Sequence, residues 1–275
     1  MGTYKIGVRA HDIGKLSAHD LANAVKSFGF DGVQLVFPKA LGKNVLDVNL
    51  YEVKSSFNDS IMLLGAYFNM IHPDSSEIHK GIDNFINNIH AANKLNVKYV
   101  ATETGSLMGS PWGYVPENHS DESFNKVKVV TKKLLEVAEE YNVNVLIEGA
   151  FAHTIYSPQR LHQLVTELNH PNLDVIIDVY NFLNIDNHLS HVEILKDSLK
   201  LLKDHIKVIH LKDYIVEDNK LKQVGLGKGI MNYKKTFELL EECHNSPYLV
   251  FEGVNKEDLT SSLAFINDII KKEGE

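Results

Sequence analysis

Short apolar runs that alternate with helical patterns along the whole chain constrain the fold more than any other feature of this sequence. We predict strands at eight places, near residues 5–11, 31–37, 61–69, 97–103, 143–149, 174–180, 206–212 and 248–253. Most of these runs are continuously apolar, as expected for a parallel sheet whose outer face is covered by helices. The segments between the runs should therefore carry those helices.

Helical periodicity fills these segments, and two of the helix starts carry recognisable capping signals. Ser17 is predicted to cap the first helix, and Ser157-Pro158 starts the fifth, since proline suits the first helical turn. Further helices are predicted near 77–95, 120–141, 187–205, 232–244 and 256–272. The segment 40–60 has the weakest pattern and is expected to be partly irregular.

Eight strand–helix alternations in 275 residues predict an α/β protein with a (β/α)₈ fold, the TIM barrel, as one domain over residues 1–275. An open, doubly wound sheet is the alternative. It is disfavoured because no glycine-rich dinucleotide-binding turn follows an early strand. No linker, repeat or low-complexity segment divides the chain.

Charge and cysteine content exclude several classes of protein. The net charge of -8, without a basic stripe, argues against a nucleic-acid partner. Cys243 is the only cysteine and is expected to pack within a helix, so a disulfide framework and a multi-thiolate zinc site are both excluded. The N-terminal residues contain no long apolar stretch, which predicts a soluble, cytoplasmic protein without a membrane span. Whether the chain forms a homo-oligomer stays open.

Four of the apolar runs end in a side chain that can bind a metal ion: Glu148, Asp178, His210 and Glu252. Such a group at the end of a buried strand costs free energy unless something compensates it. The C-terminal strand ends of a TIM barrel meet at the active-site mouth, so we predict one divalent cation bound by these four residues. Three carboxylates and one imidazole suit Mn²⁺, Mg²⁺ or Co²⁺, and Zn²⁺ is also possible. The alternative is that each residue caps its strand or pairs with a lysine or arginine.

Further polar and aromatic residues are predicted to line the same mouth and contact a small-molecule substrate. They are Arg9, His11, His72, Trp112, His153, Asn181 and Lys212. Lys212 would stabilise negative charge that develops near the cation. Trp112, in a glycine-rich loop, would either close over a bound ligand as a mobile lid, or serve as a hydrophobic anchor or a subunit contact. For the others, a surface ion pair or a solvated loop side chain is the alternative.

The motifs around these strand ends resemble those of the xylose isomerase-like TIM-barrel family. The matching segments are Leu146-Ile147-Glu148, Ile177-Asp178-Val179-Tyr180-Asn181, Ile209-His210-Leu211-Lys212-Asp213, Gly225-Leu226-Gly227-Lys228-Gly229 and Phe251-Glu252-Gly253. This family includes sugar phosphate isomerases and epimerases, ketose 3-epimerases and apurinic endonucleases. The resemblance implies that the residues matching its metal ligands, Glu148, Asp178, His210 and Glu252, bind the metal.

The resemblance also implies a metal-dependent isomerase or epimerase that acts on a sugar or a sugar phosphate. A metal that binds adjacent oxygens of a ketose polarises the carbonyl and acidifies the neighbouring C–H. Glu148 and Glu252 would then remove and return the proton through an enediolate. However, Asn181 stands where ketose 3-epimerases carry a histidine, and His153-Thr154 stand where they carry a second glutamate. A metal-dependent dehydratase of a polyol-derived ketone and a non-catalytic sugar-binding protein are therefore the alternatives.

The apurinic endonuclease branch of the family is disfavoured. It uses a cluster of metals and needs additional His and Asp ligands. This chain instead has Asn181 and Leu221-Lys222-Gln223 at the corresponding places. The acidic net charge agrees with this exclusion.

Overall fold

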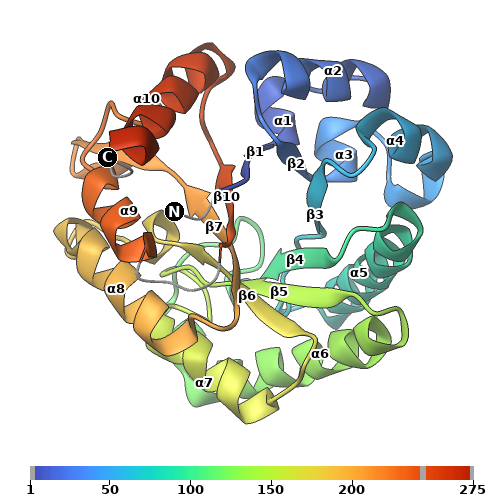
Figure 1. Cartoon of the computed structure of the whole chain (residues 1–275). Helices are drawn as coiled ribbons and strands as arrows, with labels where there is room; N and C mark the ends of the chain where they lie inside the picture. The colour runs from blue at the N-terminus through green and yellow to red at the C-terminus, as the bar shows by residue number, and fades with distance from the viewer. Residues whose placement is uncertain (1–3, 242–245, 273–275) are drawn as a thin grey trace.

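The computed structural model describes residues 4–241 and 246–272, and its central feature is a closed barrel of parallel strands (Figure 1). The strands follow one another around the ring in chain order from β1 to β7, and β10 closes the ring between β7 and β1. Their bounds are Ile6–Arg9 (β1), Gly32–Leu35 (β2), Ile61–Gly65 (β3), Tyr99–Glu103 (β4), Asn144–Glu148 (β5), Leu173–Asp178 (β6), Ile206–Leu211 (β7) and Tyr248–Phe251 (β10). Seven of them lie within a predicted run, and β6 begins one residue before its predicted run. The predicted (β/α)₈ barrel is confirmed.

The longer helices form a ring around the barrel and cover its outer face (Figure 1). They are α2 (Ala18–Phe28), α4 (Leu50–Phe57), α5 (Ser75–Leu95), α6 (Asp121–Glu140), α7 (Pro158–Leu168), α8 (His191–Leu202), α9 (Tyr233–Glu241) and α10 (Leu259–Lys272). The predicted caps are confirmed, since the Oγ atoms of Ser17 and Ser157 accept hydrogen bonds from Asp20 N and Arg160 N. Among the described residues, no helix is long and apolar enough to cross a membrane.

Two short helices and a β-hairpin were not predicted from the sequence. Single-turn helices, α1 (Ala10–Ile13) and α3 (Phe37–Ala40), follow β1 and β2 directly. Beyond β7, the strands β8 (Asp213–Glu217) and β9 (Lys220–Val224) pair antiparallel as a hairpin. Its two turn residues, Asp218-Asn219, both have positive φ, as a tight hairpin turn of this length requires.

Two other expectations concern segments of weaker pattern. The segment 40–60 is irregular only in its first part, where a 3₁₀ turn at Val45–Asp47 precedes α4. Cys243, and the end of the helix predicted over 232–244, lie outside the described residues.

Side chains that face the barrel axis form three layers, because every second residue of a strand points inward. The lower layer, at the strand starts, is largely polar and contains Tyr99, Asn144, Asp174, Lys207 and Tyr248. The middle layer is apolar and contains Met62, Leu63, Ala101, Leu146, Ile176, Val208 and Val250. The upper layer of β4 to β7 and β10 contains Glu103, Glu148, Asp178, His210 and Glu252. The C-terminal mouth of the barrel thus carries ionisable groups, and the apolar middle layer lies beneath them.

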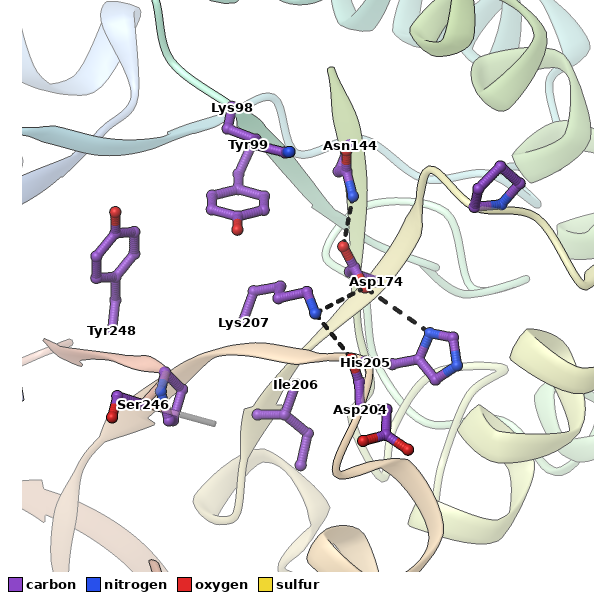
Figure 2. Close-up of a pocket in the computed structure, with 12 residues that line it drawn as sticks. Lys98, Tyr99, Asn144, Asp174, Asp204, His205, Ile206, Lys207, Ser246 and Tyr248 are labelled. Carbon is purple, nitrogen blue, oxygen red and sulfur yellow. Dashed lines mark hydrogen bonds and ion pairs between the residues drawn. The ribbon is translucent and has the colours of Figure 1, made fainter. Parts of the chain in front are cut away.

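The lower layer lines a hollow of about 600 Å³ at the N-terminal end of the barrel (Figure 2). Buried Asp174 accepts a hydrogen bond from Asn144, with Lys207 Nζ at 3.4 Å and His205 Nδ1 at 3.7 Å. Burial raises the pKa of Asp174, against the opposing effects of Asn144 and Lys207. These contacts join the starts of β5, β6 and β7 at the end of the barrel opposite Glu148, so we assign them to stability.

Candidate metal centre and active site

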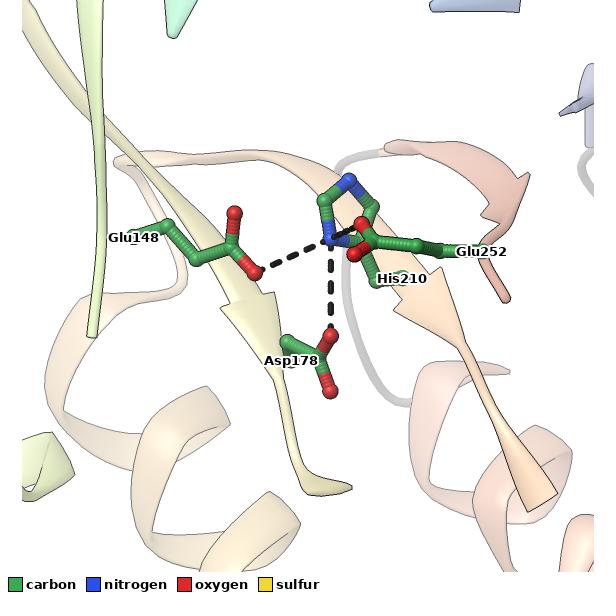
Figure 3. Close-up of side chains that lie close together, drawn as sticks. All are labelled: Glu148, Asp178, His210 and Glu252. Carbon is green, nitrogen blue, oxygen red and sulfur yellow. Dashed lines mark hydrogen bonds and ion pairs between the residues drawn. The ribbon is translucent and has the colours of Figure 1, made fainter. Parts of the chain in front are cut away.

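Glu148, Asp178, His210 and Glu252 meet at the C-terminal mouth of the barrel (Figure 3). One potential ligand atom from each of them lies within 4.8 Å of the other three. The first three residues are buried, and the side chain of Glu252 is 12% exposed. The sequence therefore identified residues that the fold brings together from β5, β6, β7 and the end of β10.

The imidazole of His210 turns its Nδ1 toward all three carboxylates (Figure 3). This nitrogen lies 3.1 Å from Glu148 Oε1, 2.8 Å from Glu252 Oε2 and 3.5 Å from Asp178 Oδ2. Burial alone would lower the pKa of His210, but Glu148 and Glu252 raise it well above its usual value. The three carboxylates thus surround one positively charged nitrogen.

This set of donor atoms fits a divalent cation. Asp178 Oδ2 and Glu252 Oε2 are buried and accept no hydrogen bond from the described part of the chain. Lys212 Nζ lies 2.7 Å from Asp178 Oδ2, and His210 Nδ1 lies 2.8 Å from Glu252 Oε2, so both oxygens are ion-paired. A bound cation is one explanation for buried carboxylate oxygens that no hydrogen bond satisfies. Three carboxylates and one imidazole are ligands that Mn²⁺, Mg²⁺, Co²⁺ and Zn²⁺ accept.

Two cationic side chains partly neutralise the carboxylates. Lys212 Nζ lies 2.7 Å from Asp178 Oδ2 and 3.1 Å from Glu252 Oε1. Arg9 Nη1 lies 2.7 Å from the same oxygen of Glu252. Burial alone would raise the pKa of Glu252, but Lys212 and His210 lower it well below its usual value. Glu252 is therefore ionised at neutral pH.

Glu148 has different surroundings, because uncharged groups donate to its carboxylate. Asn181 Nδ2 donates to Oε1 at 2.8 Å, and the hydroxyl of Tyr67 donates to Oε2 at 3.3 Å. Burial raises the pKa of Glu148, and His210 partly opposes this effect. The two glutamates therefore differ in basicity, as in enzymes that use a pair of carboxyl groups for acid and base chemistry.

A chain of hydrogen bonds through Gln34 connects Glu148 with His210. The hydroxyl of Tyr67 donates a hydrogen bond to Glu148, and its oxygen accepts a hydrogen bond from Gln34 Nε2 at 2.6 Å. The amide oxygen of Gln34 then faces His210 Nε2 at 2.8 Å and accepts a hydrogen bond from its N–H. With the proton held on Nε2, a neutral His210 has its lone pair on Nδ1, toward the carboxylates.

Sequence analysis missed Gln34 and Glu103. Gln34 is fully buried within the strand Gly32–Leu35, and a buried amide in an apolar run was the available signal. Glu103 ends β4 beside Glu148 in the strand register, so the strand-end rule applies to it as well. Burial raises the pKa of Glu103 to about 8, and the charges of Glu148 and Glu252 add to this effect.

Six of the seven predicted substrate contacts lie around the mouth. Arg9, His11 and Trp112 line a first hollow of about 510 Å³. Trp112, His153 and Asn181 line a second hollow of about 610 Å³. Lys212 is buried beside them, with Nζ 3.0 Å from Asn181 Oδ1. Asn181 thus bridges Glu148 and Lys212, which makes it a support for the four-residue cluster.

The structure does not bring His72 to this mouth. The strand β3 ends at Gly65, and the chain turns outward before His72. The ring nitrogen Nδ1 of His72 accepts a hydrogen bond from the backbone of Asp74 at 3.0 Å. Its side chain lines a separate, mostly apolar hollow with Met70 and Leu107. The predicted substrate contact of His72 therefore has no support in the structure.

Two histidines at the mouth have a buried ring nitrogen without a hydrogen-bond partner among the described residues. These atoms are Nδ1 of His11 and Nδ1 of His153. Burial lowers the pKa of both side chains to about 4, and nearby Arg9 contributes to the shift of His11. Both imidazoles are therefore neutral near pH 7 and free to hydrogen-bond an uncharged ligand.

The chain matches the family described as xylose isomerase-like TIM barrel over residues 22–269, which confirms the resemblance seen in the sequence. Solved structures with a similar fold include the 3-keto-D-glucoside 4-epimerase of E. coli, with 18% identity, a TM-score of 0.77, and coverage of 97% of this chain and 100% of that chain. The IOLI protein with a bound zinc atom has 18% identity, a TM-score of 0.76 and coverage of 98% of both chains. L-Ribulose 3-epimerase has 13% identity, a TM-score of 0.76, and coverage of 99% and 97%. Identities this low show a shared fold alone, and a comparison with curated proteins gave no match.

Proposed function

We propose, since this chain belongs to the xylose isomerase-like TIM-barrel family, that it is a divalent-metal-dependent sugar isomerase or epimerase. The observation that carries the proposal is the pairing of two carboxylates, Glu148 and Glu252, in different electrostatic surroundings within one metal-binding donor set. The cation would be held by these two residues together with Asp178 and His210. When bound, it would act as a Lewis acid that polarises a ketone and acidifies the neighbouring C–H.

In this proposal the two glutamates exchange a proton with the substrate. One of them removes the proton from the carbon next to the carbonyl, and the other returns a proton. Return to the opposite face of the same carbon gives an epimer, and return to the neighbouring carbon gives an isomer. Lys212 and Arg9, which both contact Glu252, keep positive charge close to the oxygen on which negative charge develops.

We propose that the part of the substrate that binds over the cluster carries no phosphate group. The cations closest to the cluster are already paired: Arg9 with Asp12 and Glu252, and Lys212 with Asp178 and Glu252. A phosphate group would need cations that are not neutralised in this way. Several structures of similar fold are named as epimerases of sugars or sugar derivatives, which agrees with this substrate class.

The proposal is tested by metal analysis of the purified protein and by turnover of a panel of ketoses and inososes with added Mn²⁺. We expect about one metal ion per chain, and conversion of at least one ketose that stops when the metal is removed by a chelator. Loss of water from an inosose would instead assign the dehydratase alternative. Sugar binding without any turnover across the panel would favour a non-catalytic binding protein.

A further inference from the structure

The C-terminal mouth contains two hollows, and only one of them reaches the metal-binding cluster. The first hollow is lined by Glu148 and Glu252, and the second contains none of the four cluster residues. Glu103 and Trp112 line both hollows and so stand where the two meet. A sugar ring bound over the cluster would fill the first hollow, and the second would then take another part of the ligand.

His153 lines the second hollow and has a ring nitrogen without a hydrogen-bond partner among the described residues. Its side chain is only 7% exposed, and the unpartnered nitrogen is Nδ1. Glu103 Oε1 lies 4.0 Å from this nitrogen, too far for a direct hydrogen bond. A hydroxyl oxygen placed about 2.8 Å from both atoms would bridge them, because a hydroxyl both donates and accepts.

Trp112 adds an aromatic wall next to His153. The two rings lie edge to face, with their centres 5.7 Å apart. The loop that carries Trp112 is fixed to the loop that carries His153 through Asn118, which is fully buried. The Asn118 amide donates to Ala152 O at 2.8 Å and accepts from Leu107 N at 2.9 Å. The loops that carry Trp112 and His153 are therefore joined to each other before any ligand binds.

We infer that Glu103, His153 and Trp112 form a second carbohydrate subsite, which binds an uncharged, hydroxyl-bearing sugar unit beside the one that reacts. A hydroxyl of this unit bridges His153 and Glu103, and its C–H face packs on Trp112. The inference extends the proposed function, because it assigns glycosides larger than a monosaccharide as ligands. It concerns binding alone and involves no covalent step.

Trp112 is the only tryptophan of the chain, so a change in its emission reports binding in the two hollows that it lines, and the variants and the chelator below separate one hollow from the other. The probes are methyl α-D-glucopyranoside, methyl β-D-galactopyranoside and sucrose, none of which has a free carbonyl. We expect a saturable change in emission with at least one of them, with a Kd of about 1–10 mM for a ligand held by few contacts. His153→Phe keeps a ring and removes the nitrogens, so it should weaken this binding by about tenfold, the usual value of one hydrogen bond.

His11→Phe is the matched control, since His11 is the other histidine of the described residues with a buried, unpartnered ring nitrogen, and it lines only the first of the two hollows. It should leave the glycoside titration unchanged, whereas Glu103→Ala, a second variant of the subsite, should weaken it. Circular dichroism shows whether each variant is folded. No saturable response to any of the three probes, or weakening by His11→Phe in place of His153→Phe, would overturn the inference.

A chelator separates this inference from the proposed function. Because the second hollow contains no residue of the metal-binding cluster, the Trp112 response should persist in protein treated with EDTA. An absence of metal or turnover would therefore count against the proposed function but would not contradict the second subsite. A Trp112 response that disappears with the metal would instead place the probe over the cluster and overturn the second subsite.

Discussion

Replacing Gln34 with leucine should weaken metal binding although Gln34 touches no metal-binding oxygen. In the wild type, the Gln34 amide oxygen accepts from His210 Nε2 at 2.8 Å and so reserves Nδ1 for the cation. Without this acceptor, neutral His210 can carry its proton on Nδ1, which removes the lone pair from the metal site. Loss of a residue that hydrogen-bonds a metal ligand typically reduces metal affinity by about 10–100-fold, or about 1.4–2.7 kcal/mol.

The same substitution should also lower the free energy of unfolding. Gln34 is fully buried, and leucine leaves the N–H of His210 and the oxygen of Tyr67 without their partner. An unsatisfied buried group costs about 1–3 kcal/mol, so the expected loss is of that order. Tyr67→Phe leaves the Gln34–His210 bond in place and should therefore reduce metal affinity less than Gln34→Leu does.

The assay is a competition titration of Zn²⁺ or Mn²⁺ against a chromophoric chelator, with long-range ¹H–¹⁵N spectra to identify the His210 tautomer. Asn144→Leu is the matched control, because it also removes a buried amide but lies at the opposite end of the barrel. It should reduce stability and leave metal affinity unchanged. A folded Gln34→Leu protein with wild-type metal affinity would refute the positioning role of Gln34.

Three further substitutions test other parts of the structure. Asp178→Ala should remove most of the bound metal, and unchanged metal content by elemental analysis would contradict the proposed ligand set. The pKa of His153 is lowered from 6.5 to about 4, so the unfolded chain binds more protons between these values. The wild type should therefore lose about 3 kcal/mol of unfolding free energy as the pH falls through this window, and His153→Phe should lose less in urea titrations. Asp174→Ala should reduce the free energy of unfolding by about 1–3 kcal/mol, because it leaves the buried amide of Asn144 without its acceptor. It should not change metal affinity, and a change would contradict the separation of the two ends of the barrel.

The four residues of the candidate metal site were predictable because the signal lies within single strands. A carboxylate or imidazole at the end of an apolar run is easy to recognise in the sequence alone. A closed barrel then brings all such strand ends to one mouth. Glu103 obeys the same rule, but Tyr99 and Thr102 make its run less apolar than the run before Glu148. Gln34 carries no charge and lies in a strand of four residues, so its pattern is weaker still.

The parts of the site that sequence analysis could not give depend on how loops fold back. His72 follows β3 in the chain much as His153 follows β5, yet only His153 returns to the mouth. Asn118, which joins the loops of Trp112 and His153, belongs to no periodic pattern, because its partners are backbone groups far along the chain. The donor and acceptor roles in the hydrogen bonds that link Glu148, Tyr67, Gln34 and His210 likewise follow only from three-dimensional contacts.

The most direct test of the proposed function is exchange of the substrate's C–H proton with solvent. The Mn²⁺-loaded protein is incubated in D₂O with a ketose that it converts, and deuterium in the recovered sugars is measured by NMR and mass spectrometry. We expect deuterium at the carbon next to the carbonyl without net loss of water, and a fall in turnover of about 10²–10⁴-fold in both Glu148→Gln and Glu252→Gln. Conversion without deuterium incorporation, or near-normal turnover in both variants with metal still bound, would contradict proton exchange by these two glutamates.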